Sequence, residues 1–190
     1  NQLWKISVPS GMSSPCVWRD WIFLTAFEDG KLETLCYQRR DGKLLWKQDA
    51  KAEKLEEFHS TEGSPAASTP ATDGKRVVSY FGSCGLICYD LKGKELWRHP
   101  LPTAQTAGSF GSGASPVIVD GLVLVNRDQV TGCSLLAVNL ETGKKIWEAM
   151  RPDVTQSFGT PIFWKNQGAK EVVMSGSLKL KGYDLETGAE

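Results

Sequence analysis

Short apolar runs alternate with polar turns along the whole chain. In the stretch Ser134–Trp147 an apolar run is followed by a polar turn that ends at Gly143, and a second short run carries Trp147. The same design recurs three times, at Leu35–Trp46, at Leu86–Trp97 and, in a shortened form, at Leu180–Glu190. Runs of this length bounded by Gly, Asp and Asn predict β-strands joined by tight turns. No segment shows a convincing 3.6-residue periodicity, so no long helix is expected.

Tryptophan and glycine recur at a fixed spacing. Each of three tryptophans lies four residues after a glycine, and these tryptophans are 51 and 50 residues apart. A period of this size is typical of propellers and solenoids, in which one structural unit is repeated. Trp4 takes the tryptophan position at the start of the chain, and Gly188 takes the glycine position near its end. We therefore predict a structural docking role for a set of repeated residues: Trp4, Trp46, Trp97, Trp147, Gly42, Gly93, Gly143 and Gly188.

The period divides a single region, residues 1–190, into blade-like units. Residues 1–9 are predicted to end a preceding unit, and the following units are 10–50, 51–101, 102–150 and 151–190. Each unit is expected to form a meander of four strands of about four to six residues, and the last unit to lack its final strand. A proline stands at the entrance of each first strand, where a missing N–H is tolerated. The second unit opens with a charged stretch, Lys47–Glu57, which predicts a solvated connector or a short helical turn.

A tryptophan on an outer strand explains how such units would hold together. One four-stranded sheet cannot bury both of its faces, but sheets set radially around an axis pack on their neighbours. An outer indole can then lie across the turn of the adjacent unit, where glycine leaves the peptide plane bare. We therefore predict an all-β β-propeller of four-stranded antiparallel blades, and the chain is long enough to form about four blades. The alternatives are a sandwich with the tryptophans in its core, and a closed four-bladed ring in which Asn1–Val8 supplies the outer strand of the last blade.

Composition narrows the classes of function. The chain has 22 Lys plus Arg and 22 Asp plus Glu, and this balance argues against a protein that binds nucleic acid or another polyanion. No apolar run approaches about 18 residues, so no transmembrane segment is expected. The five cysteines are an odd number, which argues against a complete disulfide framework. Apolar positions of the repeat hold Cys16, Cys36 and Cys88, which we expect to be buried, whereas Cys84 and Cys133 fall in turns and could be exposed.

One copy of the repeat carries a recognisable motif. Ala137, Asn139, Thr142–Gly143 and Trp147 stand at the spacing of the tryptophan-docking motif of pyrroloquinoline quinone (PQQ) repeat propellers, and the chain resembles that family over its whole length. Three further stretches resemble bacterial secreted or periplasmic PQQ-like repeat proteins: His59 with Ser68–Gly74, Phe81–Leu86 and Gly111–Pro116. The resemblance implies an incomplete arc of a seven- or eight-bladed propeller, in an extracytoplasmic protein whose leader is not in this chain. It also implies a relation to an outer-membrane assembly lipoprotein, which holds no quinone and binds other proteins.

The same resemblance includes the quinoprotein dehydrogenases, whose chemistry needs additional residues. They use a quinone packed on a disulfide of adjacent cysteines, a calcium ion held by acidic and amide oxygens, and an Asp base. The chain contains neither an adjacent Cys pair nor an Asp-rich calcium loop. We therefore predict no catalytic residue, metal or cofactor, and a non-catalytic scaffold that binds protein or another macromolecule through loops at one end. The alternative is part of an oxidoreductase dependent on PQQ and calcium, whose cofactor residues lie outside this stretch.

Three residues are candidates for a binding face. His59 lies just before the entrance of a first strand, where propellers build one of their surfaces. Arg127 and Asp128 follow Asn126 at the end of a second strand and form the best polar cluster for a role facing the central channel. Each candidate has a plainer interpretation. His59 would be an ordinary surface or capping residue, and Asp128 would belong to a solvated strand end.

Overall fold

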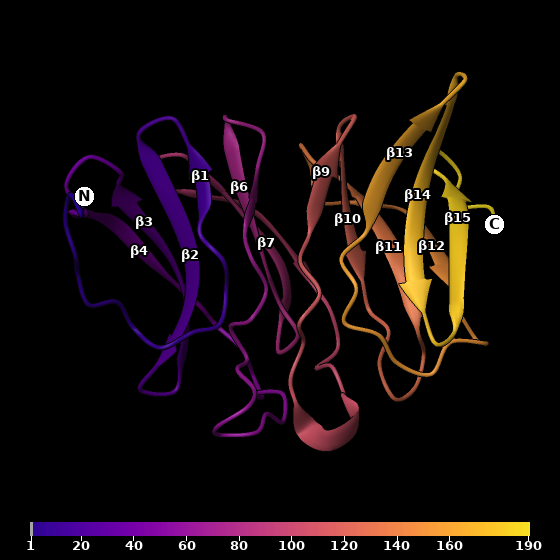
Figure 1. The fold of residues 1–190 in the computed structure, drawn as a ribbon, viewed down its shortest axis with the longest axis horizontal. Coiled ribbons are helices and arrows are strands. Elements are labelled where there is room, and N and C mark those ends of the chain that lie inside the picture. Colours follow the sequence, from indigo (N-terminus) through magenta and orange to yellow (C-terminus); the bar gives the residue numbers. More distant parts are fainter. Residues whose placement is uncertain (1) are drawn as a thin grey trace.

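The computed structural model describes residues 2–190, which form four antiparallel sheets (Figure 1). Blade 1 contains β1 (Cys16–Trp18), β2 (Trp21–Glu28), β3 (Lys31–Gln38) and β4 (Leu44–Ala50). Blade 2 contains β5 (Ala71–Thr72), β6 (Arg76–Phe81), β7 (Gly85–Asp90) and β8 (Glu95–Pro100). Blade 3 contains β9 (Val117–Val119), β10 (Leu122–Asn126), β11 (Ser134–Asn139) and β12 (Lys145–Met150). Blade 4 contains β13 (Ile162–Asn166), β14 (Ala169–Gly176) and β15 (Lys179–Asp184), and a 3₁₀ turn, η1 (Ala107–Ser109), precedes blade 3.

Each blade is a meander in which neighbouring strands in the sequence are hydrogen-bonded neighbours in the sheet. The prediction of an all-β fold built from antiparallel propeller blades is confirmed. The predicted length of four to six residues was wrong for seven strands: β1, β5 and β9 have only two or three residues, whereas β2, β3, β4 and β14 have seven or eight. The reason for the longer strands is visible in blade 1, where β2 and β3 stay paired from Trp21 and Gln38 down to Glu28 and Lys31.

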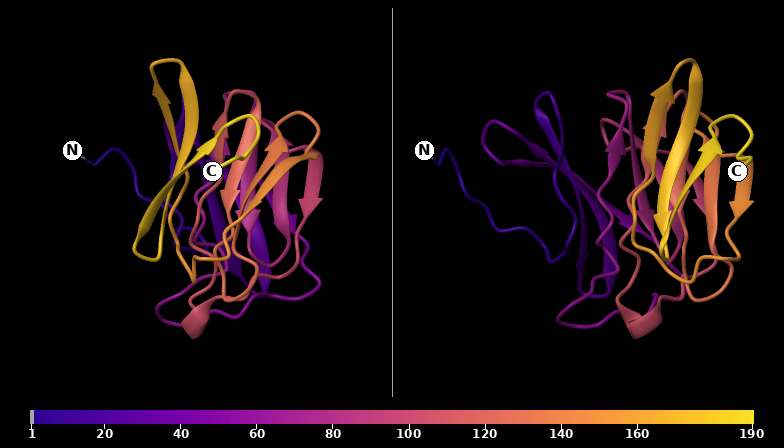
Figure 2. Two further views of the ribbon diagram at one scale, coloured as in Figure 1. Left: turned by 90° about the vertical axis from the view of Figure 1, so that its right-hand side faces the viewer. Right: turned by 45° about the vertical axis from the view of Figure 1, so that its right-hand side comes forward.

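The blades stand side by side along an open arc (Figures 1 and 2). The N-terminal segment lies beside blade 1 and the C-terminus lies at blade 4, at the opposite end of the arc. The structure is therefore not the closed four-bladed ring that was one of the alternatives.

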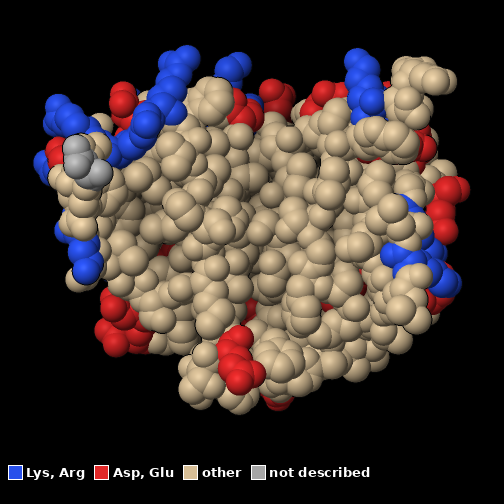
Figure 3. Space-filling model, viewed as in Figure 1, with Lys and Arg blue, Asp and Glu red and all other residues tan. Residues whose placement is uncertain are grey.

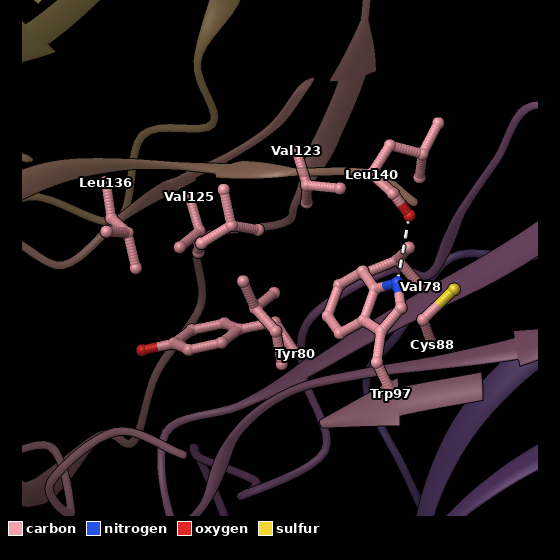
Figure 4. Packing of buried hydrophobic residues seen from close by; sticks show 10 residues of the cluster. Val78, Tyr80, Cys88, Trp97, Val123, Val125, Leu136 and Leu140 are labelled. Atoms are coloured by element: carbon pink, nitrogen blue, oxygen red, sulfur yellow. Dashed lines mark hydrogen bonds between the residues drawn. The ribbon is translucent and has the colours of Figure 1, made fainter. Parts of the chain in front are cut away.

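Most of the hydrophobic core lies between neighbouring blades. One cluster joins blade 2 to blade 3 (Figure 4): Val78, Tyr80, Leu86, Cys88 and Trp97 face Val123, Val125, Leu136 and Val138. A second cluster joins blade 3 to blade 4, and a third joins blade 1 to blade 2. These clusters bury one sheet against the next, as the repeat requires, and blade 1 carries a further small cluster of its own, formed by Ala26, Leu35 and Tyr37.

The repeated tryptophans make the same contact at each step. The Nε1 atom of Trp97 donates a hydrogen bond to the carbonyl oxygen of Leu140 in the next blade, at 2.9 Å (Figure 4). Equivalent bonds of 2.9–3.0 Å join Trp4 to Arg39, Trp46 to Leu91 and Trp147 to Leu185. The indole of Trp97 covers Gly143, which has a φ of 67°, a backbone conformation that favours glycine.

A ladder of hydroxyl groups also links the blades, at the residue before the proline of each first strand. The backbone N–H of Ser14 donates to Thr69 Oγ1 at 3.0 Å, that of Thr69 to Ser115 Oγ at 2.9 Å, and that of Ser115 to Thr160 Oγ1 at 3.1 Å. Each bond satisfies an N–H at a strand entrance, so the blades are fastened at their first strands as well as through their tryptophans.

Substituting Gly143 tests the indole contact. A Cβ atom at Gly143 would lie 2.6 Å from Trp97, so Gly143→Ala should combine a strained φ with a steric clash. We expect it to lower the free energy of unfolding by about 2–3 kcal/mol, measured by urea denaturation. Gly121→Ala is the matched control, because Gly121 has a φ of 79° but nothing within 4 Å of its Cβ position; its expected loss is about 1 kcal/mol. Equal losses for the two variants would mean that the indole contact contributes nothing.

Candidate functional site

The long connectors between blades all lie at one end of the arc, which we call the loop end. It contains residues 51–70, 101–116 and 151–161 and the turn η1, at the lower side of Figure 1. Binding residues are often carried by loops that a rigid framework positions, so this end is the first place to look for a site. Strand β10 runs toward the loop end and delivers the predicted residues Arg127 and Asp128 directly after Asn126.

Asp128 forms a buried ion pair with an arginine from the neighbouring connector. The Nε atom of Arg151 lies 2.8 Å from Oδ1 of Asp128, and its Nη2 atom lies 3.1 Å from Oδ2. Both side chains are fully buried. Arg151 also donates to the hydroxyl of Tyr183 at 2.7 Å, and Ser157 Oγ donates to Asp128 at 3.0 Å. Burial opposes the charge of Arg151, but the hydrogen bonds and charge of Asp128 outweigh it and raise the pKa of Arg151.

The interpretation of Asp128 as a solvated strand end was therefore wrong. Its carboxylate lies between blades 3 and 4, because Arg151 follows β12 of blade 3 and Tyr183 stands on β15 of blade 4. A buried pair of this kind fixes one geometry for the segments that carry it, since separating the charges would leave each one unpaired. The pair holds the connector after blade 3 against blade 4.

Arg127 points to a different set of partners. Its Nη2 atom donates to the carbonyl oxygen of Pro102 at 2.7 Å, while its buried Nε atom has no partner among the described residues. A cavity of about 10 Å³ lies beside it, which is enough for about one water molecule. Polar side chains that line this cavity are Tyr80, Thr106, Ser112, Asn126, Arg127, Asp128, Gln129 and Ser157.

Glu56 is a buried carboxylate that the sequence did not predict. Its Oε2 atom accepts a hydrogen bond from Ser112 Oγ at 2.7 Å, and its backbone N–H donates to Ser83 Oγ at 3.0 Å. Its Oε1 atom is buried without a partner in the described part of the chain. Burial raises the pKa of Glu56 to about 7. The interpretation of Lys47–Glu57 as a solvated connector or helical turn was thus wrong at both ends, since β4 extends to Ala50 and Glu56 is inside.

His59 lies on the exposed surface of the loop end. Its ring is 6.4 Å from that of Phe110, and its Nδ1 atom is 3.0 Å from Thr61 Oγ1. Phe110 and Phe158 are 42% and 43% exposed on the connectors that follow blades 2 and 3. We call His59, Phe110 and Phe158 the loop-end aromatic residues. The structure places His59 apart from Arg127 and Asp128, so the three predicted binding residues do not form one site.

The residues that the resemblance to quinoproteins would require do not come together in the described chain. Residues 2–190 contain no group of three or more His, Cys, Asp or Glu side chains that could hold a metal ion. All five cysteines are free, and Cys84 and Cys133 are buried rather than exposed as their turn positions had suggested. These residues do not fit a calcium ion or a quinone packed on a disulfide, and we derive no chemical step through either group. In addition, none of the helices in the described residues is long and apolar enough to cross a membrane.

Comparisons with known proteins agree with this fold. A family model described as "Outer membrane protein assembly factor BamB" matches residues 33–190, whereas no curated protein sequence matches the chain. A quinohemoprotein alcohol dehydrogenase from Pseudomonas putida HK5 is similar in structure, with a TM-score of 0.65 and 18% identity over 100% of this chain and 35% of the dehydrogenase. BamB from Moraxella catarrhalis gives a TM-score of 0.60 and 13% identity over 98% of this chain and 53% of BamB. The computationally designed protein Ika4 gives a TM-score of 0.66 and 14% identity over 97% of this chain and 98% of Ika4.

The structural similarities are all below 25% identity and therefore show the fold alone. The chain spans about a third of the length of the dehydrogenase and about half of the length of BamB. The family match covers most of the chain and agrees with the resemblance drawn from its tryptophan motifs. The chain therefore belongs to the PQQ-repeat propeller family whose model is described as outer membrane protein assembly factor BamB.

Proposed function

We propose that this chain is a non-catalytic scaffold that binds a protein partner through the loop end. The observation that carries the proposal is the exposure of Phe110 and Phe158 on connectors that buried polar contacts hold in place. Aromatic side chains in protein interfaces supply large contact areas and lose little conformational entropy on binding. The family is described as an assembly factor for outer membrane proteins, which supports a protein partner and a location outside the cytoplasm.

The framework under the loop end favours binding without rearrangement. Asp128 and Arg151 fix the connector that carries Phe158, and Glu56 joins the connector after blade 1 to Ser112 in the connector that carries Phe110. Residues positioned in this way present a surface of defined shape, which lowers the entropic cost of association. In Figure 3 the charged side chains lie around the rim of the face, and those at the loop end, at the bottom of the view, are Asp and Glu. We therefore expect a partner segment that combines apolar and basic side chains.

Photo-crosslinking in the source cells tests this proposal. A photoreactive phenylalanine derivative replaces Phe110, Phe158 or, as the control, Ile146, which is 50% exposed on the outer strand β12. We expect one discrete crosslinked protein from each of the two loop-end positions and none from position 146. Equal crosslinking from all three positions, or none from the loop end, would contradict the proposal.

The second function, a PQQ-dependent oxidoreductase, is tested on the same protein. PQQ and calcium ions are added together, and the absorbance of bound quinone is measured after free quinone is removed. A stoichiometric signal would contradict the non-catalytic proposal, and no retained quinone is the expected result.

A further inference from the structure

Trp18 covers a turn of the next blade at the end of the arc opposite the loop end, which we call the turn end. The turn end contains the short turns between β1 and β2, between β5 and β6, and between β9 and β10, at the upper side of Figure 1. The indole of Trp18 lies on Gly74 of blade 2, because a Cβ atom at Gly74 would lie 2.4 Å from its Cζ2 atom. The guanidinium of Arg19 lies over the same ring, 5.8 Å from its centre. An aromatic side chain with a basic neighbour thus joins blade 1 to the turn of blade 2.

An aspartate takes the place of this tryptophan at the step from blade 2 to blade 3. The strand pairing aligns Trp18, the last residue of β1, with Asp73, which directly follows β5. The carboxylate of Asp73 accepts hydrogen bonds from the backbone N–H groups of Lys75 and Arg76 at 2.8 and 2.6 Å, so it points back to its own turn. In the corresponding turn of blade 3, a Cβ atom at Gly121 would meet nothing within 4 Å in the described chain. The place that an indole fills in blade 2 is therefore open in blade 3, although both blades have neighbours on either side.

The open place is a groove of about 520 Å³, a volume within the range of ligand pockets. We call it the turn-end groove, and it is lined by residues 72, 73 and 76 of blade 2 and by residues 118–121 and 139–141 of blade 3. Its apolar part contains Ile118 and Val119, which are half-buried, and Leu140, which is buried. Ile118 and Leu140 belong to the core between blades 2 and 3, so an apolar group in the groove would extend that core.

The charged side chains that line the groove favour a cation. Three of them are carboxylates, Asp73, Asp120 and Glu141, and one is a guanidinium, Arg76. Arg76 is shared by two carboxylates, since it lies 3.2 Å from Asp73 and 3.3 Å from Glu141. Asp120 is paired with Lys170 of blade 4 at 2.7 Å. The side chain of Glu141 is 75% exposed, and exposed ion pairs contribute little, so Glu141 can turn toward another cation at small cost.

We propose that the turn-end groove binds a partner protein through an aromatic side chain that has a basic residue next to it, as Trp18 has Arg19. The aromatic ring would lie on the bare turn at Gly121 and against Leu140, and the basic group would meet Glu141. The ring supplies a large apolar contact, and the basic group complements the excess of carboxylates. The occupant is a polypeptide because the filled counterpart of the groove is occupied by two successive side chains of a strand end. The proposal concerns the turn end and does not depend on the binding role of the loop end.

A peptide titration followed by NMR spectroscopy tests the proposal. The probe is the tetrapeptide Ala-Trp-Arg-Ala with both ends blocked, added to the isotope-labelled chain. We expect a saturable shift of the Gly121 amide resonance with a Kd on the order of 1 mM, as suits one anchoring side chain. Gly132 is the internal control, because it is an exposed glycine at the loop end with a similar φ of 70°. An unchanged Gly121 resonance at about 10 mM peptide, or an equal shift of Gly132, would overturn the proposal.

Two matched peptides separate the role of the ring from that of the charge. Ala-Leu-Arg-Ala keeps the basic group without the ring, and Ala-Trp-Glu-Ala keeps the ring with the opposite charge. Each should bind about 5-fold more weakly than Ala-Trp-Arg-Ala, since each lacks one of the two complementary features. If either peptide bound as tightly as Ala-Trp-Arg-Ala, the groove would not have the proposed specificity.

A pair of charge reversals tests the place of binding on the chain. Glu141→Lys should weaken binding of Ala-Trp-Arg-Ala about 5-fold to 10-fold, because it puts a like charge where the basic group would lie. Glu186→Lys is the matched control. Glu186 is exposed at the same place in the corresponding turn of blade 4, and the backbone N–H groups of Glu141 and Glu186 donate to Asn139 and Asp184 in the same way, at 3.0 and 3.1 Å. The two variants should be equally stable, and equal effects on peptide binding would overturn the proposal.

Discussion

Replacing Asp128 with alanine is expected to lower the free energy of unfolding by about 3–5 kcal/mol, because it leaves the guanidinium of Arg151 buried without its counter-charge. Arg151 would keep only its bonds to the Tyr183 hydroxyl and the Ser175 carbonyl, both neutral acceptors. The loss should be seen as a lower midpoint of urea denaturation with an unchanged slope.

The matched control is Asp153→Ala. Asp153 also accepts two short contacts from basic side chains, Lys179 at 2.6 Å and Lys181 at 2.8 Å, but all three groups are accessible to solvent to some degree. Exposed pairs contribute about 0–1 kcal/mol, so Asp153→Ala should be nearly neutral. If the two variants lost the same stability, burial would not be what gives the Asp128 pair its importance.

A double variant separates the cost of an unpaired charge from the net contribution of the pair. Asp128→Leu combined with Arg151→Met removes both charges and leaves apolar side chains in their place. Replacing both members of a buried pair is often close to neutral, so the double variant should be more stable than Asp128→Ala. Some loss should remain, because the Tyr183 hydroxyl and the Ser175 carbonyl would lose the donor that Arg151 supplies.

The blades could be predicted from the sequence because their signals are local and repeated. Asp73–Gly74 is a typical hairpin turn, and the apolar run after it forms β6, Arg76–Phe81. The 50-residue step then relates one blade to the next without any knowledge of their contacts. The family, the antiparallel sheets and the propeller architecture all follow from this repetition.

The buried polar groups could not be predicted, because their partners are distant in the sequence. Asp128 meets an arginine 23 residues away, and Glu56 meets a serine 56 residues away. The neighbouring residues in the sequence do not distinguish either carboxylate from an exposed one, so the local sequence predicts that both are exposed to solvent. One weak signal was present for Arg151: it directly follows the outer strand β12 and is therefore the first residue of the connector to blade 4. Cys84 and Cys133 were misjudged for the same reason, since turn residues at the loop end lie beneath the connectors.

Unfolding should show a pH dependence that Glu56 controls. Its pKa in the folded protein is raised to about 7, above the ordinary value of 4.5, and burial is the main cause. Between these two values the folded state binds more protons than the unfolded state, so stability falls as pH rises through this range and levels off above about 7. The contribution of this group is about 3 kcal/mol at its full extent. Urea denaturation at pH 5 and pH 8 measures it.

Glu56→Gln should remove most of this pH dependence, because the amide is neutral at both pH values. Glutamine can also accept the hydrogen bond from Ser112 Oγ, and its NH₂ group occupies the place of the buried atom that has no partner. Glu57→Gln is the control at the adjacent, exposed position and should retain the dependence of the unsubstituted protein. Arg127 acts in the opposite direction, since its charge favours the ionised form of Glu56. Arg127→Met should therefore steepen the fall in stability between pH 5 and pH 8, and a flatter profile would show that Glu56 does not control it.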